Sequence, residues 1–123
     1  MKLYGQEFLL DLYDCDPNTF TRDSISDFCA KVCEEIGMER GPIHFWDDES
    51  TPKDQKETEP HTHGISAVQF IRTSNITIHT LHMLRRVYLN VFSCNPFEAG
   101  KVEESAVNWF QGQVNNYVDI GRR

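Results

Sequence analysis

Alternation of apolar and polar positions predicts strands in the first two thirds of the chain. The segment from Tyr4 to Asp16, "YGQEFLLDLYDCD", is short, rich in leucine and aromatic residues, and ends at Asp16-Pro17-Asn18, a sequence typical of turns. Further strands are predicted over 65–72 and 75–79, two runs rich in β-branched residues. They meet at Thr73-Ser74-Asn75, which places a serine at the junction of two strands.

The segment "RRVYLNVFSC" predicts another strand, and its two faces differ. Successive side chains of a strand project from opposite sides, so one face carries Val87, Leu89 and Val91. The opposite face carries Tyr88, Asn90, Phe92 and Cys94. Cys94 ends this strand, where a reactive side chain can project from the sheet. A weaker last strand is predicted over 114–118.

Helical periodicity follows each group of strands. Ser24, with Asp27 three residues later, resembles a capping box, and Gly37 supplies a stop. Between them the apolar residues recur at helical spacing: Ile25, Phe28, Cys29, Val32, Cys33 and Ile36. A second amphipathic helix is predicted after Asn95-Pro96, with one apolar side formed by Val102, Ala106, Trp109 and Phe110.

This order of elements favours the α/β class in its α+β form, a two-layer sandwich in which a mostly antiparallel sheet carries helices packed on one face. The chain has 123 residues, 39% of them apolar, which suits a single domain over 1–123. The segment from Gly41 to His63 interrupts the pattern, because it is highly charged, contains three prolines and has little apolar periodicity after Trp46. We expect a long loop there, functional or disordered.

Composition and charge exclude several classes of partner. A net charge of −7 and a pI near 5.1 argue against binding to nucleic acid, which requires clustered lysine and arginine. No apolar run approaches the roughly 20 residues that span a bilayer, and no signal peptide precedes the first strand, so we expect a cytoplasmic protein and no membrane partner. In that compartment the four cysteines, which form no C-x-x-C pair, should be thiols.

Four residues have side chains that can act as nucleophiles, acids or bases: Ser66, Ser74, His79 and Cys94. With their neighbours they read Gly64-Ile65-Ser66, Thr73-Ser74-Asn75, Ile78-His79-Thr80 and Phe92-Ser93-Cys94. This order resembles the small bacterial and archaeal S-adenosylmethionine decarboxylases, whose pattern is Gly-x-Ser, Glu-Ser-His, Ile-His-Thr and Phe-x-Cys. The intervals coincide without a gap. The first strand and the overall length also agree, so the likeness covers most of the chain and is tightest between Gly64 and Cys94.

The resemblance implies a self-processing, pyruvoyl-dependent decarboxylase of polyamine biosynthesis. The chain would cut itself between Thr73 and Ser74 into residues 1–73 and 74–123, and Ser74 would become the pyruvoyl cofactor. Ser66 would support the backbone rearrangement, and His79 would remove the Cα proton of residue 74. Cys94 would return a proton to the α-carbon of the substrate, so its thiol should be protonated before the chemistry, and a strongly depressed pKa would be unhelpful. A homodimer with its sites near the subunit interface is also implied.

The positions that bind the nucleoside in the resembled family differ here. Leu81-His82-Met83 stands in place of Trp-Pro-Glu, and Pro60 aligns with a second aromatic residue. These changes remove aromatic stacking of ~1–3 kcal/mol per face and a charge-assisted hydrogen bond of roughly 1.5–3 kcal/mol. Since some relatives act on L-arginine or L-ornithine, we expect a basic amino acid as substrate. Asp47, Asp48 and Glu49 are candidates for binding its cationic side chain.

Three alternatives stay open. S-adenosylmethionine itself is one candidate substrate. Thr73 and Asn75, where the family has glutamate and histidine, leave room for a non-cleaving, non-catalytic relative that binds a true decarboxylase. A metal site is the third alternative, because His61-x-His63 and His79-x-x-His82 supply ligand-type residues and Cys94 is a further candidate ligand; their spacing fits no zinc signature, and we expect no metal.

Overall fold

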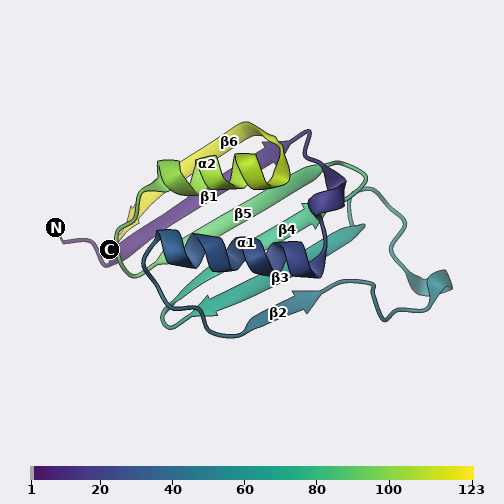
Figure 1. Ribbon diagram of the computed structural model, residues 1–123, viewed down its shortest axis with the longest axis horizontal. Coiled ribbons are helices and arrows are strands. Elements are labelled where there is room, and N and C mark those ends of the chain that lie inside the picture. The colour runs from purple at the N-terminus through teal and green to yellow at the C-terminus, as the bar shows by residue number, and fades with distance from the viewer. Residues whose placement is uncertain (1) are drawn as a thin grey trace.

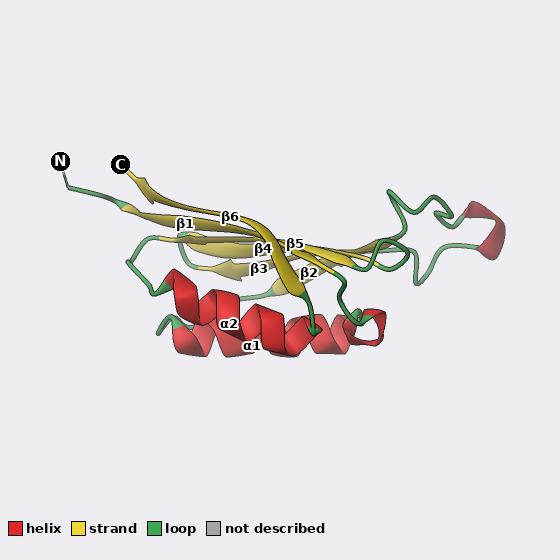
Figure 2. Cartoon of the chain, turned by 90° about the horizontal axis from the view of Figure 1, so that it is seen from above, coloured by secondary structure: helices red, strands yellow, loops and turns green. Residues whose placement is uncertain are grey.

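A computed structural model describes residues 2–123, which form one six-stranded antiparallel sheet with two α-helices on one of its faces (Figures 1 and 2). The strands, given in their order across the sheet, are β2 (Ile43–Trp46), β3 (Gly64–Ile71), β4 (Ser74–Leu81), β5 (Arg86–Ser93), β1 (Gly5–Tyr13) and β6 (Gln113–Arg122). The helices are α1 (Arg22–Glu35) and α2 (Ala99–Phe110), with short 3-10 helices at Pro17–Thr19 and Lys53–Gln55. The predicted two-layer α+β architecture is confirmed.

The core lies between the sheet and the two helices. Alternate residues of the central strands point toward the helices and are buried, among them Leu10, Leu12, Ile76, Ile78 and Leu89. From the helices come buried residues at the predicted apolar positions: Ile25, Phe28, Cys29, Val32, Cys33, Val102, Ala106 and Phe110. Burying each large apolar side chain contributes about 1.5–3 kcal/mol, so this layer accounts for much of the stability of the fold.

Helix α1 begins earlier than predicted. Thr21 is its N-cap, and the Thr21 side chain accepts a hydrogen bond from the backbone N–H of Ser24 at 3.1 Å. The expectation of a capping box at Ser24 is therefore wrong. The Ser24 hydroxyl instead accepts a hydrogen bond of 3.0 Å from the indole Nε1–H of Trp109, which links α1 to α2.

The strand predictions need three further corrections. The segment from Gly41 to His63 is not loop throughout, because Ile43–Trp46 pairs with β3 as an edge strand. Strand β4 includes Ser74 and runs to Leu81, and β6 is longer than the predicted 114–118. Within residues 2–123, no helix is both long and apolar enough to cross a membrane.

One face of the sheet carries both helices, and the other is left open within a single chain (Figure 2). This second face is called the open face below. It exposes apolar side chains from the middle and the edge of the sheet, including Phe70, Val118 and Ile120.

Candidate active site

Ser74 is the first residue of β4, directly after a two-residue turn. In the β3–β4 hairpin Ile71 pairs with Ser74, so the turn consists of Arg72 and Thr73. Arg72 has a φ of 33°, a region in which residues other than glycine are strained. The peptide bond between Thr73 and Ser74 thus joins a strained turn to a well-paired strand.

The hydroxyl of Ser74 is held by the end of the neighbouring strand. The side chain is buried, with 5% of the residue's surface exposed, and its Oγ accepts a hydrogen bond of 2.9 Å from the backbone N–H of Cys94. Cys94 directly follows β5, which pairs with β4 through contacts such as Asn75 with Phe92. The predicted nucleophile and the predicted acid therefore meet at this end of the sheet.

The thiol of Cys94 differs in proton affinity from the other cysteines. Hydrogen bonding to the side chain of Ser74, and then to that of Thr73, lowers the pKa of Cys94. Burial instead raises the pKa of Cys15 to about 11 and that of Cys29 to about 12. A downward shift disfavours the predicted role of Cys94 as an acid, and it arises because hydroxyl groups that stabilise a thiolate lie beside the sulfur.

Ser66 and His79 form a second pair on the same hairpin. They are directly opposite each other in the β3–β4 ladder, and the Ser66 Oγ lies 2.7 Å from the His79 Nδ1. Both side chains project from the open face, where His79 is exposed.

The two pairs do not come together within one chain. Ser74 and His79 are five residues apart on β4, a separation of about 16 Å at the usual strand rise. The side chain of Ser74 shares the helix-covered face with Ile76 and Ile78, whereas that of His79 projects from the open face. The sequence spacing that identified these residues therefore does not reflect a four-residue cluster in the single chain.

A hollow of about 440 Å³ lies beside Ser74. Its lining combines the hairpin turn with open-face residues of four strands: Glu7, Phe70, Arg72, Thr73, Ser74, Asn75, Thr77, Asn90 and Phe92. Sequence reasoning missed Glu7 as a site residue. In the sheet, Phe92 pairs with Asn75 on one side and with Glu7 on the other, and only the strand order brings β1 to this position.

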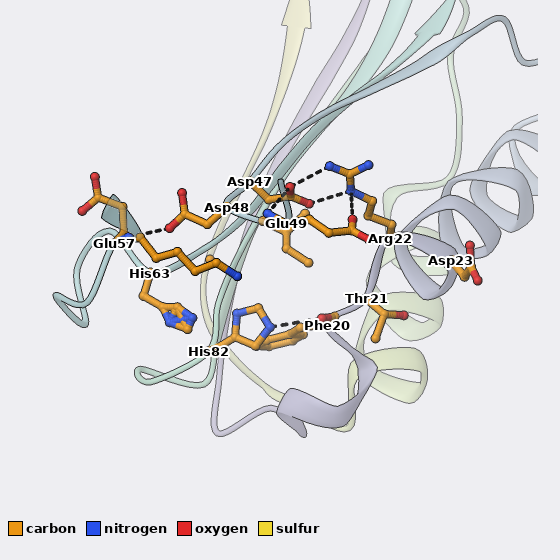
Figure 3. A pocket seen from close by; sticks show the side chains of 13 residues that line it. Phe20, Thr21, Arg22, Asp23, Asp47, Asp48, Glu49, Glu57, His63 and His82 are labelled. Carbon is orange, nitrogen blue, oxygen red and sulfur yellow. Dashed lines mark hydrogen bonds and ion pairs between the residues drawn. The ribbon is translucent and has the colours of Figure 1, made fainter. Parts of the chain in front are cut away.

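The acidic run lines a different pocket, of about 520 Å³, near the far end of the β3–β4 hairpin (Figure 3). Asp47 and Glu49 both form ion pairs of 2.7 Å with Arg22. The hydrogen bond from Arg22 holds the pKa of Asp47 below its usual value. Asp48 accepts a hydrogen bond from the backbone N–H of Glu57. Within one chain these carboxylates face Arg22 and their own loop. Ser74 does not line this pocket, because it lies at the opposite end of the β3–β4 hairpin.

Three of the four histidines considered as metal ligands, His63, His79 and His82, have other contacts. His63 and His82 stack with ring centroids 5.0 Å apart, and the Nε2 of His82 lies 3.1 Å from the carbonyl oxygen of Phe20 (Figure 3). Burial is the main cause that lowers the pKa of His82. Among residues 2–123, no three or more side chains of histidine, cysteine, aspartate or glutamate are grouped so that they could hold a metal ion.

Comparisons with known proteins identify a family and a similar fold. A family model described as S-adenosylmethionine decarboxylase matches residues 6–123. Among solved structures, the chain is similar to the adenosylmethionine decarboxylase from Aquifex aeolicus VF5, with a TM-score of 0.77 and 18% sequence identity over 99% of this chain and 92% of that one. No curated protein gives a significant match. At that identity the structural likeness concerns the fold, and the family model carries the assignment.

Proposed function

The chain belongs to the S-adenosylmethionine decarboxylase family, and from this premise we propose that it is a self-processing decarboxylase whose pyruvoyl group derives from Ser74. The observation that carries the proposal is the placement of Ser74. Its hydroxyl is buried beside the Cys94 thiol, and its amide nitrogen follows a turn strained at Arg72. A fixed nucleophile directly after a strained turn is what an intramolecular rearrangement requires.

The processing reaction uses groups that the hairpin already holds. The Oγ of Ser74 attacks the carbonyl carbon of Thr73, the peptide C–N bond breaks, and an ester joins the two residues. Removal of the Cα proton of residue 74 then breaks the Cβ–Oγ bond, which leaves Thr73 with a free carboxylate and residue 74 as dehydroalanine. Addition of water and loss of ammonia convert residue 74 into the pyruvoyl group.

Cys94 is suited to start this sequence. A thiolate beside the Ser74 hydroxyl can accept its proton as Oγ attacks, and the lowered pKa of Cys94 raises the thiolate fraction near neutral pH. The backbone N–H of Cys94 orients the same oxygen. One residue therefore both positions and activates the nucleophile.

We further propose that the enzyme is a homodimer in which a second copy supplies Ser66 and His79 to the Ser74 of the first. Two observations support this arrangement. Within a chain His79 lies about 16 Å along the strand from Ser74, beyond the reach of a proton transfer. The open face, which carries both Ser66 and His79, also exposes apolar residues such as Phe70 that a second copy would cover.

In the decarboxylation step the pyruvoyl carbonyl supplies an electron-withdrawing group that takes up the electrons released as carbon dioxide leaves. The chain's own residues do the rest. The hollow lined by Ser74 receives the substrate. Cys94, whose backbone N–H contacts the Ser74 hydroxyl, delivers a proton to the α-carbon.

The proposed substrate is a basic amino acid, L-arginine or L-ornithine. The residues that stand where the family binds the nucleoside support this choice, because His82 stacks on His63 and contacts the ring and the carbonyl oxygen of Phe20, so its ring is already engaged within the chain. S-adenosylmethionine is the second candidate, favoured by the description of the family model.

Mass spectrometry under denaturing conditions tests the processing proposal. The purified protein should appear as two pieces, residues 1–73 and a pyruvoyl-blocked piece of residues 74–123. Labelled carbon dioxide release from arginine, ornithine and S-adenosylmethionine then identifies the substrate. An uncut chain with an unmodified Ser74 would contradict the enzyme proposal and favour a non-cleaving binding partner of another decarboxylase.

A further inference from the structure

The side chain of Arg122 is held by a carboxylate and an aromatic ring on the open face. Its guanidinium forms an ion pair with the carboxylate of Glu7. The same group lies over the ring of Phe92, with Cζ 5.7 Å from the ring centroid. Glu7 and Phe92 are direct neighbours across β1 and β5, so together they offer one acidic and one aromatic contact to a planar cation.

Glu7 and Phe92 also line the hollow beside Ser74. Asn75, Phe92 and Glu7 lie in one row across β4, β5 and β1, so Glu7 is two strand spacings, about 10 Å, from the strand that begins with Ser74. An extended side chain with six bonds from Cα to its terminal nitrogen spans about 7 Å. A charge-assisted hydrogen bond adds about 2.8 Å. Measured from the backbone of residue 74, where the pyruvoyl carbonyl would lie, the side chain of arginine is therefore about long enough to reach Glu7 across the hollow that both residues line.

We propose that Glu7 and Phe92 form the recognition site for the guanidinium of a substrate of the L-arginine class, and that Arg122 occupies this site when substrate is absent. The inference rests on the proposed decarboxylase function and identifies the group that selects its substrate. Arg122 is half exposed and lies at the end of an edge strand, so its side chain can leave the site without opening the core.

The chemistry of the pair favours a guanidinium over an ammonium. A guanidinium is planar, meets a carboxylate with directed N–H groups and stacks on aromatic rings, whereas an ammonium is a strongly hydrated point charge. The acidic run provides a weaker candidate, because Asp47 and Glu49 are already paired with Arg22. Arginine should accordingly be preferred over ornithine.

Steady-state kinetics of the cleaved enzyme with L-arginine test the inference through changes of opposite sign. Glu7→Gln should raise KM about 10- to 100-fold, the range for losing a hydrogen bond to a charged group. Arg122→Ala should lower KM, because the competing guanidinium is removed. Asp11→Asn, on the same face of β1 but outside the hollow, and Arg86→Ala, which removes a guanidinium stacked on Tyr13 at 4.0 Å, are matched controls that should leave KM unchanged.

The outcomes separate this inference from the function on which it rests. Cleavage of every variant is followed by mass spectrometry, so a wild-type chain that stays uncut contradicts the decarboxylase proposal itself. A cleaved Glu7→Gln enzyme with unchanged KM for arginine overturns the recognition site alone. The recognition site is also overturned if Arg122→Ala raises KM as much as Glu7→Gln does, because the ion pair would then only support the fold. Binding of agmatine, measured by calorimetry, should weaken in Glu7→Gln and strengthen in Arg122→Ala, which checks the site without turnover.

Discussion

The two ends of the β3–β4 hairpin carry different halves of the proposed chemistry. At the turn, Ser74 and Cys94 form a buried contact between a nucleophile and a thiol with a lowered pKa. Toward the other end, Ser66 and His79 form an exposed pair on the open face. Residues only a few positions apart in sequence, such as Ser74 and His79, can therefore lie at opposite ends of a hairpin strand and on opposite faces of the sheet.

The two ends also differ in their charged groups. At the far end the acidic run is paired with Arg22, and the ion pairs fix the loop against the start of α1. At the turn end Glu7 faces the hollow, and its carboxylate forms an ion pair with the half-exposed Arg122 from the edge of the sheet. The acidic run at the far end was the candidate from sequence, whereas the carboxylate that lines the same hollow as Ser74 is that of Glu7 at the turn end.

The largest effect is expected at the turn end. Ser74→Ala removes the oxygen that attacks the backbone, so self-cleavage should be abolished and the intact 123-residue chain should be recovered. Denaturing mass spectrometry measures the result directly, and Ser66→Ala, which keeps the nucleophile, should slow cleavage without eliminating it. Two fragments from Ser74→Ala would refute the mechanism.

Mixing variants tests whether the two ends meet across subunits. In a dimer of one Ser74→Ala chain and one His79→Ala chain, the first chain can supply His79 to the Ser74 of the second. After random assembly of a two-fold dimer, about half of the His79→Ala chains should then be cut. Co-expression with distinguishable tags followed by mass spectrometry gives the yield. Cleavage that never exceeds that of either variant alone would mean that the halves do not combine.

The thiol is expected to set the pH dependence of cleavage. The thiolate fraction of Cys94 rises with pH, so the rate of cleavage should rise with pH and then level off. Because hydrogen bonds lower the pKa of Cys94, the rate should level off below the ordinary thiol pKa of about 8.5. Cys94→Ala should remove that limb of the profile and slow decarboxylation about 10²- to 10⁴-fold. Cys33→Ala, at a buried thiol of the core, provides the control. An unchanged profile in Cys94→Ala would assign the titration to another group.

The smallest effect is expected at the start of α1, beside the far pocket. Thr21→Ala removes the N-cap hydrogen bond and should lower the free energy of unfolding by about 1 kcal/mol. Urea denaturation measures this loss, while cleavage at Ser74 should proceed as in the wild type. A cleavage defect in this variant would contradict the expectation that the start of α1 does not affect processing at Ser74.

The elements with strong periodicity were predictable from sequence. Both helices, the first strand and the strands around Ser74 follow from regular apolar spacing. The short strand Ile43–Trp46 escaped prediction because it has four residues next to Pro42 and lies at an edge, where pairing with β3 stabilises it. Thr21 was missed as N-cap because Ser24 fits the local pattern equally well. In the structure the Thr21 side chain accepts a hydrogen bond from the Ser24 N–H, and the Ser24 hydroxyl instead accepts one from Trp109.

The candidate site was predictable in its residues and less so in its arrangement. The spacing from Ser66 to Cys94 singled out four residues, and the structure arranges them as two contacting pairs, Ser66 with His79 and Ser74 with Cys94. Their separation follows from the register of β3 and β4, and the position of Glu7 follows from β1 pairing with β5, a contact between distant parts of the chain. The proton affinity of Cys94 depends on two hydroxyl groups whose positions are set by the turn.

Under the proposed self-cleavage, Cys94 would keep its hydroxyl contacts only until the chain is cut. In the proposed scheme the Oγ of Ser74 departs as a carboxylate oxygen of Thr73, and the Thr73 hydroxyl is released with the new chain end. The sulfur then loses both groups that favour its ionised form, and its proton is held more firmly. Self-cleavage would thus change the role of the Cys94 thiol. Before the cut it accepts a proton from Ser74, and afterwards it can donate a proton to the substrate in each turnover.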